Sequence, residues 1–148
     1  MLLILAQLCS TLYMVGLIWF VQLVHYPLHG HVGTDSFASY QRLHMQWTSY
    51  AVGPAMLIEA VSTVALLLNP PQQIPNIAFW IGLGLLLMIW GSTGLLQVPY
   101  HEQLTRSFSS DAHSMLVWSN WIRTFAWSAR GLLVLWFVYI LMQPSFSN

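Results

Sequence analysis

The sequence contains no lysine, and its charged residues are very few. Of its 148 residues, four are arginine and four are aspartate or glutamate, so charged side chains make up 5% of the chain. A soluble domain carries about 25% charged residues, because water must wet its surface. This scarcity argues against a water-soluble domain. Zero net charge without a basic run likewise argues against nucleic acid as a partner.

Other familiar signals are also missing. The single cysteine, Cys9, excludes an internal disulfide. The sequence has no HExxH, ExxH or CxxCH spacing, so no motif identifies a metal site or a covalently attached haem. Any site must therefore be located from the distribution of polar residues rather than from a signature.

Long hydrophobic runs dominate what is present. Hydrophobic residues make up 57% of the chain. A bilayer core needs about 20 helical residues, and four apolar stretches are that long. We expect these helices at 2–26, 47–68, 76–98 and 116–142. The sequence thus predicts an all-α, integral membrane four-helix bundle that forms a single domain over residues 1–148, with the lipid bilayer as its surroundings.

The two long connections, 27–46 and 99–115, are amphipathic. Pro27 is expected to break the first helix, because proline lacks an N–H and its ring clashes with the preceding turn. Each link is predicted to hold a short interfacial helix. Thr34-Asp35 would cap the first of these, over 36–45, and Ser110-Asp111 would cap the second.

The two halves resemble each other. The helix 2–26 ends in Gln22-Leu23-Val24-His25-Tyr26-Pro27, and the helix 76–98 ends in Gln97-Val98-Pro99-Tyr100-His101. An amphipathic link and a Trp-rich helix start follow in both halves. This pattern predicts two pseudo-repeated hairpins related by a twofold axis along the membrane normal.

Polar residues gather at one end of the predicted bundle. All six histidines lie at the ends of the odd helices, the starts of the even helices, or the links between them: His25, His29, His31, His44, His101 and His113. Five other polar residues join them: Gln22, Gln97, Glu102, Asn120 and Arg123. The candidate site is therefore at this end, where Arg42 and Arg106 also lie. The positive-inside tendency places this end in the cytoplasm, and we expect a bacterial inner membrane crossed several times.

One buried ion pair is predicted from depth. Glu59 follows Trp47 by twelve residues, and Arg130 follows Trp118 by the same number. Both helices run in the same direction, so both groups lie about 18 Å past this tryptophan belt at about 1.5 Å per residue. An unpaired charge there costs at least about 2.5–3.5 kcal/mol. We therefore expect Glu59 and Arg130 to pair, or Glu59 to be protonated and hydrogen-bonded.

The histidines allow a metal or haem interpretation beside a purely structural one. His25, His44 and His101 are the candidate ligands, because bundle cores often hold such groups between facing helices. Interfacial histidines also often bond only to helix ends. His29, His31 and His113 are expected to be solvated loop residues.

The region 96–124 resembles a known family. Leu96-Gln97-Val98-Pro99-Tyr100-His101, followed by Trp118-Ser119-Asn120-Trp121-Ile122-Arg123-Thr124, is similar to the pattern of the anthrone-oxygenase-like family of small membrane proteins. That pattern is Val-Pro-Leu-Asn, a link, then Trp with Asn and Arg-Thr. The likeness extends loosely over most of the chain, but His101 stands where the family has Asn. It implies oxidation of polycyclic phenols by oxygen without a required metal, at a site lined by Pro99, His101, Asn120 and Arg123.

Such chemistry suits the residues at this end. A phenolic substrate needs an apolar slot with aromatic walls, which these residues are expected to form: Trp19, Trp47, Trp121 and Trp127. Neutral His25 or His101 would accept the proton, and Arg123 would stabilise the oxyanion. Gln22, Gln97 and Asn120 are the expected polar contacts of a hydrophobic small molecule.

Two other functions remain open. The first alternative is a structural or assembly subunit of a membrane complex, and the second is a haem- or quinone-binding electron-transfer protein. Gly84, Gly91 and Gly94 share one face of the helix 76–98. Small residues at such spacing let helices approach closely, either within the bundle, which we favour, or across a homodimer.

Overall fold

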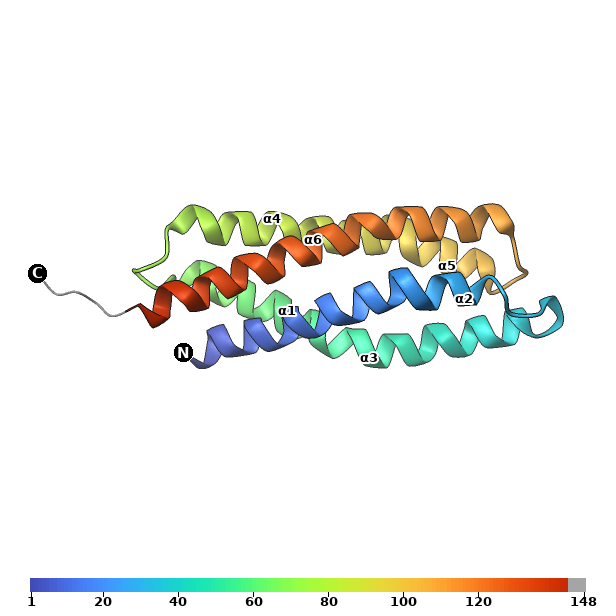
Figure 1. Cartoon of the computed structure of the whole chain (residues 1–148), viewed down its shortest axis with the longest axis horizontal. Coiled ribbons are helices and arrows are strands. Elements are labelled where there is room, and N and C mark those ends of the chain that lie inside the picture. Colours follow the sequence, from blue (N-terminus) through green and yellow to red (C-terminus); the bar gives the residue numbers. More distant parts are fainter. Residues whose placement is uncertain (144–148) are drawn as a thin grey trace, which may run out of the picture.

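Four long helical rods run antiparallel side by side (Figure 1) in the computed structural model, which describes residues 1–143 apart from the side chain of Thr34. The first rod consists of α1 (Leu2–Phe20), η1 (Val21–His25) and α2 (Tyr26–His29), and the second is α3 (Thr34–Leu68). The third consists of α4 (Asn76–Ser92), η2 (Thr93–Gln97) and α5 (Val98–Leu104), and the fourth is α6 (Ser110–Met142). Each rod is long and apolar enough to cross a membrane. The predicted all-α membrane bundle is confirmed.

The amphipathic links do not form separate helices. They are helical, as expected, but α3 begins at Thr34 and α6 at Ser110, and both run unbroken into the spans. Residues 36–47 and 110–121 contain neither proline nor glycine, so the i→i−4 hydrogen bonds continue without interruption. The cap positions also differ from the expected ones, since Gly33 precedes α3 and the Ser109 side chain accepts from the Ala112 N–H before α6.

Pro27 does not break the first rod, contrary to expectation. A five-residue π-helix, η1, ends two residues before it, and α2 carries Pro27 as its second residue. The Tyr26 N–H donates to the Val21 carbonyl, which closes a turn one residue longer than an α-turn. The wider turn shifts the preceding carbonyl with which the proline ring would collide, so the rod continues.

The same sequence of a π-turn and a proline-containing helix recurs in the second half of the chain. The five-residue η2 is followed at once by α5, whose second residue is Pro99. Both π-turns lie where a rod enters the histidine-rich end. This agreement in backbone form supports the predicted pseudo-repeat of the two hairpins.

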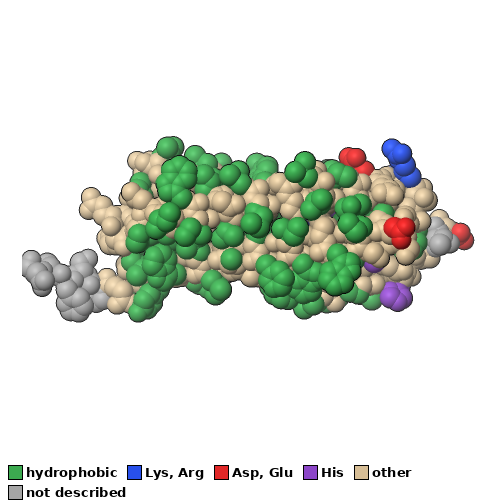
Figure 2. Space-filling view, turned by 90° about the horizontal axis from the view of Figure 1, so that it is seen from above, with side chains coloured by type: hydrophobic (Ala, Val, Ile, Leu, Met, Phe, Trp, Pro, Cys, Tyr) green, Lys and Arg blue, Asp and Glu red, His purple; other side chains and the backbone are tan. Residues whose placement is uncertain are grey.

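The outer surface of the rods is apolar, while charges gather at one end (Figure 2). Large hydrophobic side chains such as Leu57, Leu95 and Leu132 are exposed along the spans. Gly84 and Gly94 are also exposed, and a Cβ at either would meet no atom within 4 Å. The favoured packing of these glycines inside the bundle is therefore wrong.

A buried polar network joins all four rods in the half of the bundle away from the histidines. Arg130 Nε donates to Glu59 Oε1 at 3.3 Å, and both side chains are almost fully buried. Glu59 also accepts from Thr11 Oγ1 of α1 at 2.7 Å and from Trp127 Nε1 at 2.9 Å. Arg130 donates further to the Gly82 carbonyl of α4 and to Thr63 Oγ1 at 3.0 Å. The predicted Glu59–Arg130 ion pair is present, and it ties the bundle together.

Replacing one member of this pair should lower the free energy of unfolding of the bundle. A lone charge left in a buried pair costs about 3–5 kcal/mol, whereas an apolar replacement of both members is often neutral. We expect Glu59→Leu to lower the free energy of unfolding by that amount and Glu59→Leu/Arg130→Leu to restore most of it. Equilibrium unfolding in mixed micelles measures the free energy of unfolding of both variants. Leu57→Ala, at an exposed position, is the control. A single variant as stable as the parent would contradict the account.

Candidate functional site

The six histidines do lie at one end of the rods, but two of them are placed differently from the expectation. His31 is exposed, as expected of a loop residue. His29 is only 1% exposed, and His113 is half-buried with its Nε2 at 3.0 Å from the Tyr26 carbonyl oxygen. These two are structural residues because α2 and α6 continue helical backbone through positions that were expected to be loops.

A chain of oriented hydrogen bonds crosses this end. Gln41 Oε1 can only accept, so His29 Nε2 donates to it at 2.8 Å. Gln41 Nε2 donates in turn to His101 Nδ1 at 2.9 Å. The single proton of neutral His101 is therefore on Nε2, which donates to Tyr26 Oη at 3.2 Å.

The chain continues beyond the tyrosine. The Tyr26 hydroxyl donates to Gln97 Oε1 at 3.3 Å, and Gln97 Nε2 donates to Ser119 Oγ at 2.7 Å. Every member from His29 to Ser119 thus has a fixed direction. His101 uses both of its ring nitrogens in this chain, which holds it as a neutral tautomer.

Arg123 is held by neutral groups. Its Nε and Nη2 donate to Asn120 Oδ1 at 2.9 and 2.6 Å, and Nη1 donates to Thr93 Oγ1 at 3.4 Å. The guanidinium also lies 5.8 Å from the centre of the Trp127 ring. Within residues 1–143, the one salt bridge is that of Arg130, so no carboxylate balances the charge of Arg123.

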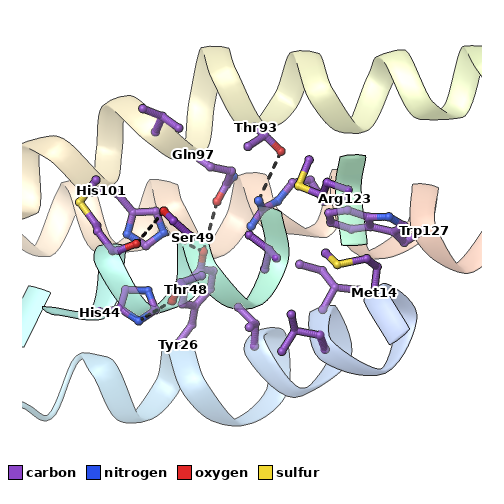
Figure 3. Close-up of a pocket in the computed structure, with 17 residues that line it drawn as sticks. Met14, Tyr26, His44, Thr48, Ser49, Thr93, Gln97, His101, Arg123 and Trp127 are labelled. Carbon is purple, nitrogen blue, oxygen red and sulfur yellow. Dashed lines mark hydrogen bonds between the residues drawn. The ribbon is translucent and has the colours of Figure 1, made fainter. Parts of the chain in front are cut away.

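Arg123 borders a cavity of about 160 Å³ between α1, α3, η2 and α6 (Figure 3). One part of its wall is polar: Tyr26, His44, Thr93, Gln97, His101 and Arg123. Much of the remaining lining is apolar: Met14, Leu17, Ile18, Val52, Met56 and Trp127. Such an apolar pocket with a few convergent polar groups is the usual form of a small-molecule site.

The structure brings some of the predicted site residues together. Gln97, His101, Arg123 and Trp127 all line the cavity. Gln22 and Asn120 stand behind Arg123, since Asn120 Nδ2 donates to Gln22 Oε1 at 2.7 Å. The polar half of the predicted site is therefore assembled around Arg123.

Other predicted residues lie elsewhere. Trp47 is 67% exposed on the outside of α3. Trp19 and Trp121 meet edge to face at 5.8 Å, away from the cavity lining. His25 does not line the cavity either, and its Nε2 is buried without a partner among the described residues. The aromatic wall is thus supplied by Trp127 alone of the four tryptophans expected there.

Gln41, Tyr26 and Thr93 are among the cavity and network residues that were not predicted in these roles. Gln41 has no sequence signal, since one glutamine in an amphipathic helix is ordinary. Tyr26 directly follows η1 and Thr93 is the first residue of η2, and π-turns are frequent at functional sites. The prolines that follow the two π-turns, Pro27 and Pro99, are the one signal that could have pointed to them.

The geometry does not fit the metal or haem interpretation. Over residues 1–143, no three histidine, cysteine or acidic side chains are grouped to hold a metal ion. The His25 and His44 rings stack face to face at 4.5 Å, and His44 lies 5.3 Å from the His101 ring. A cavity of about 150 Å³ admits benzene, and a porphyrin is several times larger. The residues therefore do not form a haem pocket here.

Fold and site together define a multi-pass membrane protein of four helices whose cavity lies beside an arginine lacking a carboxylate partner. No protein-family model matches the chain, and no curated protein or solved structure matches it either. Its own geometry is therefore what indicates a function.

The oriented chain makes a test possible at Gln41. Gln41→Met should leave His29 Nε2 and His101 Nδ1 without partners and lower the free energy of unfolding, by about 1–3 kcal/mol for each unsatisfied group. Nitrogen NMR of labelled histidine should show His101 protonated only at Nε2 in the parent and as mixed tautomers in the variant. Gln46→Met, exposed on the same helix, is the control. A parent His101 protonated at Nδ1 would contradict the assignment.

Proposed function

We propose that the protein is a small membrane oxidoreductase whose cavity binds a lipophilic phenol and whose Arg123 holds the phenol oxygen as an anion. The observation that carries this proposal is the charge of Arg123 beside an apolar cavity, with only neutral groups as its partners. Arg130, seven residues further along α6, has Glu59. Arg123 is therefore the cation left for a ligand.

Energetics favour an anionic ligand at this place. An arginine within a membrane span costs at least about 2.5–3.5 kcal/mol at the helix centre. Preorganised donors in a site that excludes water stabilise an oxyanion by more free energy than the same donors do in water. Asn120 holds two of the guanidinium nitrogens, so Arg123 is oriented before any ligand arrives.

His44 is the residue that we propose to accept the phenol proton. His101 lines the cavity but uses both ring nitrogens in the hydrogen-bonded chain. His25 lies outside the lining. His44 lines the cavity, and of its two nitrogens only Nδ1 has a described partner, Thr48 Oγ1 at 3.2 Å. In the proposed scheme Nδ1 carries the ring proton and donates to Thr48 Oγ1, which leaves Nε2 as the acceptor of the phenol proton. His44 thus replaces His25 and His101 as the expected base.

The oxidation itself is proposed from the resemblance to the anthrone-oxygenase-like family. Dioxygen would be the oxidant, with one oxygen atom entering the phenolic ring to give a quinone and the other leaving as water. A phenolate gives up electrons more readily than a phenol, so Arg123 and His44 would promote the reaction by forming and holding the anion. No residue of the site has to change its oxidation state in this scheme.

Binding and turnover in nanodiscs test the proposal. We expect Arg123→Gln to weaken binding of a lipophilic phenol about 10- to 100-fold, because a hydrogen bond to a charged group is worth about 1.5–3 kcal/mol. It should also abolish the preference for the phenol over its methyl ether. Equilibrium dialysis measures affinity, and an oxygen electrode measures turnover. Arg106→Gln, exposed at the same end, is the control.

Two results would contradict it. Equal affinity of the parent for phenol and methyl ether would remove the anionic site. Tight binding without oxygen uptake would leave a carrier or an assembly subunit in place of an oxidoreductase.

A further inference from the structure

We infer that the cavity receives its ligand sideways from the bilayer through an opening between α3 and α5, so that the ligand is a single-ring phenol whose alkyl tail stays in the lipid. This inference rests on the proposed function and names the substrate class and its route. Three observations carry it: which wall of the cavity is exposed, which walls are closed, and how large the cavity is.

The exposed wall faces outwards from the side of the bundle. Of the lining residues, Ser49 of α3 and Val98 of α5 are exposed, and Met45, one turn before Ser49 on α3, is half-buried. Ser49 stands two residues after Trp47, whose ring is 67% exposed. Tryptophan is typical of the membrane interface. At a rise of about 1.5 Å per residue, the opening lies about 3 Å deeper in the membrane than this tryptophan.

The end of the bundle nearest water is closed. A cluster of fully or almost fully buried side chains fills it: Tyr26, Phe37, Leu104, Ala112 and Leu116. The chain from His29 through Gln41 and His101 crosses the same level. A ligand coming along the bundle axis from water would have to disrupt both.

The opposite end of the cavity is closed as well. Met14, Ile18, Met56 and Trp127 belong to a buried cluster at this level. Beyond it, Glu59 binds Trp127, Thr11 and Arg130. The side between α3 and α5 is therefore the route that requires the least rearrangement.

The volume of the cavity limits how much of the ligand it can enclose. The cavity measures about 160 Å³, and a buried apolar cavity of about 150 Å³ holds benzene. One ring therefore fits, with its oxygen towards Arg123 and His44. The rest of a lipophilic molecule has to leave through the opening, where lipid solvates an alkyl tail without cost. A fused polycycle does not fit inside whole.

A blocked opening tests the inference. We expect Ser49→Trp to weaken binding of para-dodecylphenol in nanodiscs at least about tenfold, a change of about 1.4 kcal/mol. Ala51→Trp, exposed on another face of α3, should leave it unchanged. Val98→Trp obstructs the same opening from α5 and takes the place of Ser49→Trp if that variant does not fold.

A second measurement locates the tail. A dodecylphenol with a diazirine at its tail end should crosslink to lipid-facing residues of α3 and α5 in the parent. Crosslinks at the histidine-rich end, or unchanged affinity in both blocked variants, would overturn the sideways route while Arg123-dependent binding still supported the proposed function. Failure of dodecylphenol to bind the parent would overturn the proposed function and the inference together.

Discussion

Lipid cannot stabilise a charged side chain, so the buried Arg130 and the half-buried Arg123 must both find polar partners within the protein. Arg130 is satisfied by Glu59 together with Thr63 and the Gly82 carbonyl. Since Thr11 of α1 also binds Glu59, a single network holds all four rods at one depth. Arg123, on the same helix, has only neutral partners. One arginine thus joins the four rods, and the other is the cation to which the proposed function assigns the ligand.

The backbone places the polar groups that surround Arg123. Two π-turns, each followed by a proline, bring Tyr26, Thr93 and Gln97 to the cavity without breaking the rods. Gln41 donates to one ring nitrogen of His101, and the other ring nitrogen donates to Tyr26, so both nitrogens of this histidine are engaged. The result is a cavity lined by oriented polar groups as well as apolar side chains, with His44 as the cavity histidine whose Nε2 has no hydrogen-bond partner among the described residues.

The sequence predicts the class of fold and the end that carries the site, because lipid requires long apolar helices and keeps polar residues together. It also predicts the Glu59–Arg130 pair, because rise per residue converts sequence distance into depth. It does not predict how each helix is rotated about its axis. Lipid is as apolar as the core, so hydrophobicity alone does not show that Trp47 faces outwards or that Trp19 and Trp121 pair away from the cavity.

The central claim is that the cavity beside Arg123 stabilises an oxygen anion. Its most direct test is the absorption spectrum of a bound lipophilic phenol whose phenolate absorbs at longer wavelength, recorded below the pKa that the ligand has in solution. The account predicts a phenolate spectrum for the ligand bound to the parent protein and a neutral phenol spectrum when Arg123 is replaced by glutamine. A bound ligand that remains neutral in the parent would contradict it.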